Sequence, residues 1–259
     1  MKKHLNIIKI GGNVINSETQ LDSFLAGFST LQGLKILVHG GGRKATEVAD
    51  SMGLEPVMIG GRRVTNEANL DVVTMVYAGL INKNIVAKLQ AKECNALGLS
   101  GADANVIRAH KRIVKEIDYG FAGDIDEIEN KTIALLLNGG ITPVFSAITH
   151  DRKGQLLNTN ADTIAAELAK GLSADFEVEL IYCFEKKGVL RNVEDDESVI
   201  ENLNSKSYKL LKNEGVINEG MLPKLENCFD ALHNGVKKVI IGNPDLIKNR
   251  NKKYTTLTL

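Results

Sequence analysis

The sequence contains no tryptophan, few aromatic residues (5%) and only three cysteines. Cys94, Cys183 and Cys228 lie far apart and form no Cys-x-x-Cys pair, so the sequence indicates neither a disulfide framework nor a zinc site. It also lacks any run of 18 apolar residues, and its first strand-like segment begins near Leu5, too early for a signal peptide to precede it. We therefore expect a cytoplasmic protein that does not enter a membrane.

The sequence also has no excess of positive or negative charge. The 32 basic side chains of Lys and Arg balance 32 acidic ones. Such a chain has no long-range field to attract nucleic acid or an anionic membrane, and its few aromatic rings offer little for bases to stack on. Any bound anion must be held by a local pocket. We therefore expect the partner to be a small molecule.

Short apolar segments bounded by glycines alternate with segments of helical period along the 259 residues. Residues 5–10, 36–38 and 143–145 have the composition of buried strands. Helical periods follow at residues 17–31 and 70–91, among others. This alternation predicts an α/β fold, with a central, mostly parallel sheet covered by helices on both faces.

A change in strand pattern near residue 173 indicates a boundary between two lobes. In the segment 176–184, apolar residues alternate with Glu177 and Glu179, which predicts a strand with one polar face near the edge of the sheet. We therefore divide the chain into an N-terminal lobe, residues 1–173, and a C-terminal lobe, residues 174–259.

Lys9 lies inside the apolar segment Ile7-Ile8-Lys9-Ile10 and is followed by Gly11 and Gly12. A buried ammonium group is costly unless an anion pairs with it, and glycines let backbone N–H groups approach a phosphate closely. The motif therefore indicates an anion site at a strand end. On its own, the motif is better explained by an edge-strand lysine that points to water before an ordinary turn.

A second glycine turn, His39-Gly40-Gly41-Gly42, follows strand 36–38 and precedes a helix, where free N–H groups favour negative charge. Alone, it can be a flexible loop, and we interpret His39 as structural. Because ligands of open α/β sheets bind beyond the carboxyl ends of the strands, both turns are predicted to face one pocket. The sequence has neither a Walker motif nor a dinucleotide fingerprint.

Three further segments carry more polar groups than local structure requires. Asn158-Thr159-Asn160-Ala161-Asp162 precedes a helix, and an N-cap explains only one of its polar residues. Gly220-Met221-Leu222-Pro223-Lys224 sets a lysine near a helix start, where the helix dipole opposes a cation. Arg62-Arg63 can clamp a carboxylate, although arginines in surface loops are common. The lysine and the two arginines indicate an anionic ligand.

Six segments, taken together and in this order, resemble the amino-acid kinase family over nearly the whole chain. They are Ile8-Lys9-Ile10-Gly11-Gly12, Val38-His39-Gly40-Gly41-Gly42, Gly61-Arg62-Arg63-Val64-Thr65, Leu97-Gly98-Leu99-Ser100-Gly101, Leu157-Asn158-Thr159-Asn160-Ala161-Asp162 and Gly220-Met221-Leu222-Pro223-Lys224. The resemblance implies a three-layer α/β/α sandwich. It also implies a phosphotransferase that moves the γ-phosphoryl group of ATP to the side-chain carboxylate of N-acetyl-L-glutamate, the second step of arginine biosynthesis.

The resemblance also implies roles for individual residues. Lys9 and Lys224 would stabilise the phosphoryl group in transfer, and Asp162 would organise the two lysines. Backbone N–H groups would bind the phosphoryl oxygens and the substrate, and Arg63 and Asn158 would bind the substrate's α-carboxylate. The glycines that supply these N–H groups are Gly11, Gly12, Gly41 and Gly42. No side chain is expected to be a dedicated metal ligand.

In the family, the acyl amino acid binds the N-terminal lobe, which also dimerises, and ATP with Mg²⁺ binds the C-terminal lobe. The nucleotide residues implied here are Glu185, Lys186, Lys187, Gly188, Val216, Ile217 and Asn218. The chain departs from the family at this point, because it reads Cys183-Phe184-Glu185 where the family usually has Ser or Thr followed by Asp-Val. The departure affects the predicted contacts with the adenine and ribose of ATP, and it leaves the predicted phosphate site unchanged.

Alternatives remain open at this stage. The same chemistry on N-succinyl-L-glutamate requires a spare cation near the acyl pocket, for which Arg62 and Arg108 are candidates. A non-catalytic ligand-binding regulator with this fold is a second alternative, against which the lysines and Asp162 argue. Arginine-inhibited relatives carry an additional N-terminal helix that links dimers into a hexamer, so we expect a homodimer without arginine feedback.

Overall fold

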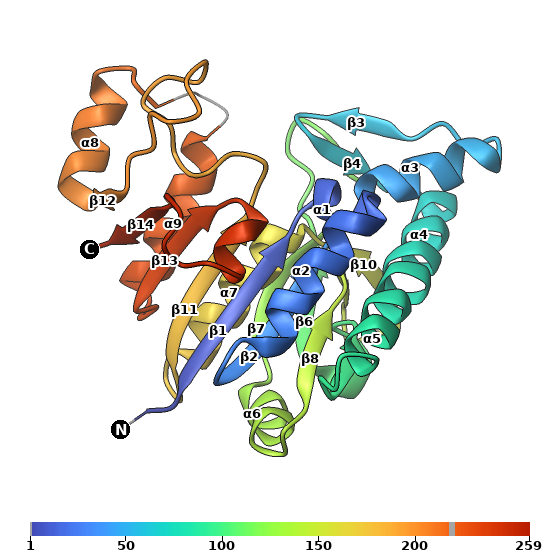
Figure 1. Ribbon diagram of the computed structural model, residues 1–259. Coiled ribbons are helices and arrows are strands. Elements are labelled where there is room, and N and C mark those ends of the chain that lie inside the picture. The colour runs from blue at the N-terminus through green and yellow to red at the C-terminus, as the bar shows by residue number, and fades with distance from the viewer. Residues whose placement is uncertain (1, 218–220) are drawn as a thin grey trace.

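The computed structural model describes residues 2–217 and 221–259. Its centre is an eight-stranded sheet in the order β12-β14-β13-β11-β1-β2-β8-β5 (Figure 1). The strands are β1 (His4–Ile10), β2 (Leu34–His39), β5 (Ala96–Leu99), β8 (Thr142–Phe145), β11 (Glu177–Cys183), β12 (Asn202–Asn204), β13 (Lys238–Gly242) and β14 (Thr255–Thr258). Neighbours are parallel except for β13 and β14. The predicted mostly parallel sheet is confirmed.

Helices cover both faces of this sheet, as predicted (Figure 1). One face carries α6 (Asn130–Asn138), α7 (Ala161–Leu172) and α9 (Leu222–His233), and the other carries α2 (Glu18–Thr30) and α5 (Asn82–Gln90). Helix α7 packs against the central strands because Ile164, Leu168 and Leu172 fall on one stripe and are fully buried. The carboxyl ends of β1 and β2 therefore open toward one edge of the molecule, between the layers.

Strand β11 corrects the sequence prediction of an edge position. It lies between β1 and β13 in the interior of the sheet. Glu179 is only 3% exposed, and its carboxylate pairs with Lys238 at 2.7 Å and Arg250 at 2.8 Å. A glutamate within a strand normally indicates a solvent-exposed face. Here Glu179 is buried instead, because two cations that are distant in sequence neutralise it.

A single long helix runs from Glu67 to Gln90 and contains a π-helical segment. Its parts are α4 (Glu67–Thr74), η1 (Met75–Ile81) and α5. By length and composition alone it could cross a membrane, but Val73, Ile85 and Leu89 are fully buried against the rest of the protein. It is therefore packed as a core helix. The π segment matters for the site, because it carries Tyr77.

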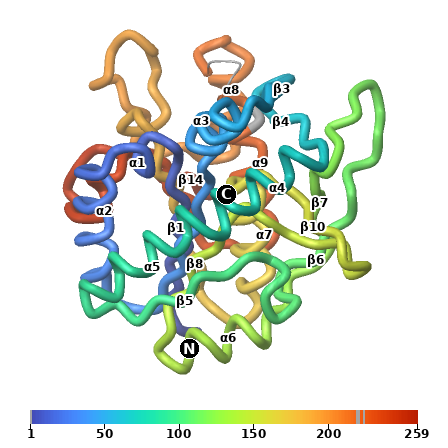
Figure 2. The backbone as a smooth tube through the Cα atoms, turned by 90° about the vertical axis from the view of Figure 1, so that its right-hand side faces the viewer, coloured from blue at the N-terminus to red at the C-terminus, as the bar shows by residue number. Residues whose placement is uncertain are grey.

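The remaining elements lie outside the central sheet. They are α1 (Gly12–Asn16), α3 (Gly42–Ser51), the hairpin β3 (Val57–Ile59) and β4 (Arg62–Val64), the four-stranded sheet β10 (Leu156–Asn158), β9 (Ile148–His150), β6 (Ile107–Lys111) and β7 (Gly123–Ile128), α8 (Ser205–Asn213), η2 (Asp103–Asn105) and η3 (Pro244–Ile247). The hairpin and the segment between β6 and β7 lie on the same side of the molecule (Figure 2). Backbone hydrogen bonds from Thr65 to Tyr119 and from Phe121 to Thr65 join them.

Candidate active site

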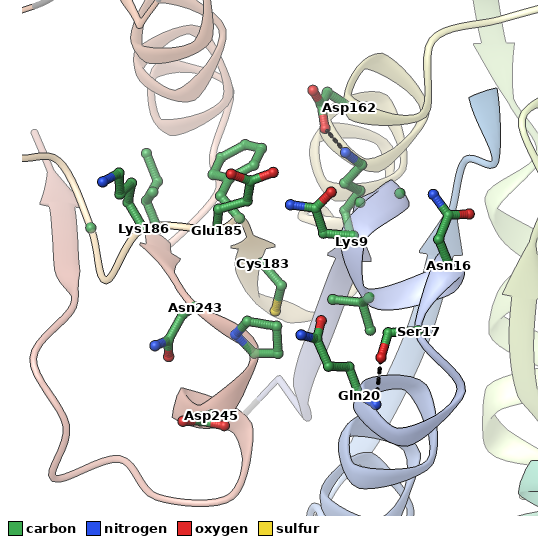
Figure 3. A pocket seen from close by; sticks show the side chains of 18 of the residues that line it. Lys9, Asn16, Ser17, Gln20, Asp162, Cys183, Glu185, Lys186, Asn243 and Asp245 are labelled. Atoms are coloured by element: carbon green, nitrogen blue, oxygen red, sulfur yellow. Dashed lines mark hydrogen bonds and ion pairs between the residues drawn. The ribbon is translucent and has the colours of Figure 1, made fainter. Parts of the chain in front are cut away.

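Two cavities open at the carboxyl ends of the central strands. The larger cavity, about 880 Å³, lies between the β1 turn and the segments that follow β11 and β13 (Figure 3). The smaller cavity, about 420 Å³, lies beneath the β3–β4 hairpin. Both have volumes typical of small-molecule sites. Among the residues that the structure describes, five line both cavities, and we call these the junction: Lys9, Gly11, Gly12, Arg43 and Asp162.

An ion pair forms the centre of the junction. The ammonium of Lys9 lies 2.7 Å from Oδ1 of Asp162, with the two side chains 11% and 23% exposed (Figure 3). Asp162 is held in the first turn of α7, where the side chain of Asn160 caps the helix and the hydroxyl of Tyr182 donates to the Asp162 carbonyl at 3.0 Å. The expectation that a lysine buried in β1 needs an anionic partner is thus met by a carboxylate from across the fold.

Lys224 reaches the same region from the first turn of α9. Its ammonium lies 4.3 Å from the centre of the Phe184 ring, and the Lys9 ammonium lies 5.5 Å from the same centre. Cation–π attraction to one ring therefore holds both ammonium groups at the wall of the larger cavity. Phe184 follows β11, at the point where the sequence departs from the family it resembles, so the departure supplies the ring that both cations contact.

The two glycine turns lie where the sequence predicts. Gly11 precedes α1, and Gly41 precedes α3. A Cβ atom at Gly41 would overlap Cδ1 of Ile81 and touch the Tyr77 ring, so only glycine allows the helix start to pack against the long helix. Gly41 and Gly42 line the smaller cavity, so the start of α3, where backbone N–H groups lack helical partners, lies at that cavity.

Arg63 is 93% buried in the wall of the smaller cavity, as its 7% exposure shows. Its Nη2 donates to the Gly42 carbonyl at 3.0 Å and to Oγ1 of Thr46 at 2.6 Å. Its Nη1 is buried and has no hydrogen-bond partner within the described part of the chain. A buried guanidinium donor with no partner is costly, so this group is suited to a carboxylate ligand. Asn158 lines the same cavity and donates to Oγ1 of Thr65 at 3.0 Å.

His39 is structural, in agreement with its interpretation from sequence. It is fully buried, its Nδ1 lies 2.8 Å from the Gly40 carbonyl, and its Nε2 lies 3.1 Å from Nδ2 of Asn82. The neutral ring with its proton on Nδ1 satisfies both contacts. Burial lowers the pKa of His39 to about 4. Nearby, burial raises the pKa of Tyr77, with Arg63 opposing that shift.

The residues predicted to bind the nucleotide are only partly brought together. Glu185, Lys186 and Gly188 line the larger cavity. Lys187 instead pairs with Glu197 on the surface. Val216 and Ile217 pack against the hydrophobic core, with Ile217 only 4% exposed. Asn218 lies outside the described residues.

The structure adds lining residues that the sequence reasoning missed. Asn16, Gln20, Asn243 and Asp245 line the larger cavity, and Met58, Tyr77, Arg112 and Tyr119 line the smaller one. Asn243 was predictable, because it follows β13 at the same edge where β1 and β2 end. Met58 comes from the β3–β4 hairpin, Tyr77 from the π segment of the long helix, and Arg112 and Tyr119 from the segment between β6 and β7. Nothing in the local sequence predicts that these segments pack together.

This arrangement defines a phosphotransferase-like site, with two cavities that meet at paired charges and glycine turns. The chain belongs to the amino acid kinase family, whose profile matches residues 4–243. It is 56% identical over 256 residues to the acetylglutamate kinase of Cytophaga hutchinsonii, with 97% of each chain covered. The acetylglutamate kinase of Bacteroides fragilis is 54% identical over 241 residues, or 93% of this chain and 92% of that protein.

The fold resembles solved structures as well. The crystal structure of smu.665 from Streptococcus mutans UA159 superposes with a TM-score of 0.76 at 27% identity and covers 98% of both chains. The predicted three-layer fold and the resemblance stated from six sequence segments are therefore confirmed.

Proposed function

We propose that this chain transfers the γ-phosphoryl group of ATP to the side-chain carboxylate of N-acetyl-L-glutamate and so forms N-acetyl-L-glutamyl 5-phosphate. The family membership and the names of its relatives support the reaction. The observation that carries it is the ion pair of Lys9 and Asp162, which lines both cavities at once. A phosphoryl group that passes from a ligand in one cavity to a ligand in the other must cross the place where the two cavities meet.

The chemistry follows from the charges. A side-chain carboxylate is already ionised at neutral pH, so no general base is required. One of its oxygens bonds to the γ-phosphorus, the bond from that phosphorus to the bridging oxygen breaks, and ADP leaves with the electron pair. Because both reactants are anions, Lys9 and Lys224 would offset their repulsion and the charge of the transition state. N–H groups of the glycine turns would hold the phosphoryl oxygens.

The two substrates would occupy separate cavities. Among the described residues, those that line the smaller cavity all come from positions up to 162, whereas the larger cavity also draws on the segment 183–245. This division supports the assignment of acyl amino acid to the lobe 1–173 and of ATP to the lobe 174–259. The buried Nη1 of Arg63 would bind the α-carboxylate, with Asn158 beside it.

Mg²⁺ fits this site as an ion carried by ATP. Within the described residues there is no cluster of three His, Cys, Asp or Glu side chains that could hold a metal. Mg²⁺ commonly binds through one or two carboxylates together with substrate phosphates. Asp162 is the acidic side chain of the junction and would contribute to its binding, and the ion would neutralise charge on the phosphates.

We further infer a cytoplasmic homodimer. The three cysteines are free and buried, which suits a reducing compartment. The long helix exposes Met75 (51%) and Leu80 (46%), apolar side chains that a second copy could cover.

Trapping the acyl phosphate tests the proposed reaction. Purified protein supplied with ATP, Mg²⁺, hydroxylamine and N-acetyl-L-glutamate should form the corresponding hydroxamate, measured colorimetrically. Omission of ATP, or glutamate with a free amine in place of the acylated substrate, should give little product. A folded protein that yields no hydroxamate from any N-acylglutamate would not have this function.

A further inference from the structure

Cations outnumber anions on the wall of the smaller cavity. Its basic residues are Lys9, Arg43, Arg62, Arg63 and Arg112, and among the described lining residues its one acid is Asp162. Asp162 pairs with Lys9 at the junction, and Arg63 offers a buried donor for an α-carboxylate. Arg43 also lines the larger cavity, where it faces the phosphates in the proposed reaction. Arg62 and Arg112 remain without a role in that reaction.

Of these two arginines, Arg112 is paired with the carboxylate of Asp124. Nε of Arg112 donates to both oxygens of Asp124 at 3.1 Å, and its Nη2 contacts the same group. The hydrogen bond from Arg112 holds the pKa of Asp124 below its ordinary range, and the nearby charge of Arg62 acts in the same direction. Asp124 does not itself line the cavity. Within the described part of the chain Arg62 forms no ion pair, so its positive charge is left over at this wall.

The wall that carries the surplus charge is ordered. The Arg112 backbone N–H donates to the Ala122 carbonyl at 2.7 Å, and Thr65, three residues after Arg62, is hydrogen-bonded to Tyr119 and Phe121. The guanidinium of Arg112 also lies 5.7 Å from the centre of the Tyr119 ring, which lines the cavity. The side chain of Arg112 is only 23% exposed. It is thus fixed in place before any ligand arrives.

An acetyl group would leave this charge uncompensated. Its methyl group cannot pair with a guanidinium, and displacing water from a cation without replacing the lost interactions costs free energy. Once the γ-carboxylate lies at the junction and the α-carboxylate at Arg63, the acyl group has the wall of Arg62 and Arg112 beside it. A carboxylate at the end of the acyl group would pair with it.

We propose, on the basis of the phosphotransferase function above, that the smaller cavity binds an N-acyl group with a terminal carboxylate, the N-succinyl class, through Arg62 and Arg112. N-succinyl-L-glutamate is then a better acceptor than N-acetyl-L-glutamate. Arg108, the other candidate from the sequence, pairs with Glu127 and Glu129 and does not line the cavity.

The test compares kcat/KM for N-succinyl-L-glutamate and N-acetyl-L-glutamate in wild type and in Arg62→Gln, Arg112→Gln and Arg108→Gln. We expect wild type to favour the succinyl substrate. Either Arg62→Gln or Arg112→Gln should lower its kcat/KM by about 10- to 100-fold, the worth of a charged hydrogen bond, with a smaller loss for the acetyl substrate. Arg108→Gln, the matched control, should keep the wild-type preference.

A wild-type preference for the acetyl substrate, or equal losses on both substrates in the Arg62→Gln variant, would overturn the proposal. Arg62 is exposed and its replacement should not affect folding, so this variant decides the outcome if Arg112→Gln unfolds. Failure of this inference leaves activity on N-acetyl-L-glutamate intact. Failure of the proposed function abolishes activity on both substrates, so the two outcomes are distinct.

Discussion

Replacing Lys9 by methionine should lower kcat by a factor of about 10²–10³, the usual effect of removing one group that stabilises transition-state charge. Methionine retains the length of the side chain and removes the ammonium that pairs with Asp162 at 2.7 Å. Initial rates of hydroxamate formation at saturating substrates measure the change. Lys224→Met should act in the same direction, because its ammonium faces the same Phe184 ring.

Two controls separate lost chemistry from damage to the fold. Lys88 pairs with Asp22 at 2.8 Å on the surface, away from both cavities, so Lys88→Met should leave kcat unchanged. In Lys9→Met the carboxylate of Asp162 is stranded, and the double variant Lys9→Met/Asp162→Asn removes that charge. If the double variant regained wild-type turnover, the lysine would only neutralise Asp162 and its proposed part in catalysis would be wrong.

Acid should destabilise the protein through His39. Its pKa is about 4 when folded and about 6.5 when unfolded, so the unfolded chain binds more protons between these values. The neutral ring therefore makes its full contribution to the free energy of unfolding above pH 6.5, and this contribution is lost as the pH falls toward 4. By pH 4.5 the loss should reach about 2–3 kcal/mol. Urea unfolding at pH 7.5 and 4.5 measures it.

His39→Gln is the matched variant. An amide can donate to the Gly40 carbonyl and accept from Asn82 as the neutral ring does, but it does not titrate. The other histidines remain and contribute equally to both proteins. Wild type should consequently lose about 2–3 kcal/mol more than His39→Gln over the same pH change. Equal losses in the two proteins would mean that His39 is protonated without cost in the folded state.

The sequence carried enough information to predict the centre of the site. Lys9 is a charged residue in an otherwise apolar strand, and physical chemistry alone requires that an anion lie near it. Glycine turns after β1 and β2 must meet at one edge because parallel strands end together. The resemblance then selected Asp162 as the partner, and the two side chains are in contact.

Features formed by distant segments were not predictable. Glu179 reads as a residue of an exposed strand face until Lys238 and Arg250 are seen to cover it. Arg112 follows a short strand, and nothing in its neighbours indicates that a loop will dock it against the β3–β4 hairpin. The π segment that presents Tyr77 also escapes a search for ordinary helical period. In each case the feature arises from tertiary contacts between segments that are distant in sequence.

The proposed reaction requires one substrate in each cavity, with phosphoryl transfer at their junction. Calorimetric titration of wild type and Arg63→Gln with N-acetyl-L-glutamate and with a non-hydrolysable ATP analogue tests this directly. Loss of the buried Arg63 donor should weaken binding of the acyl amino acid by about 10- to 100-fold and leave nucleotide binding intact, which also shows that the variant is folded. A variant that binds the acyl amino acid normally and loses the nucleotide would contradict the assignment.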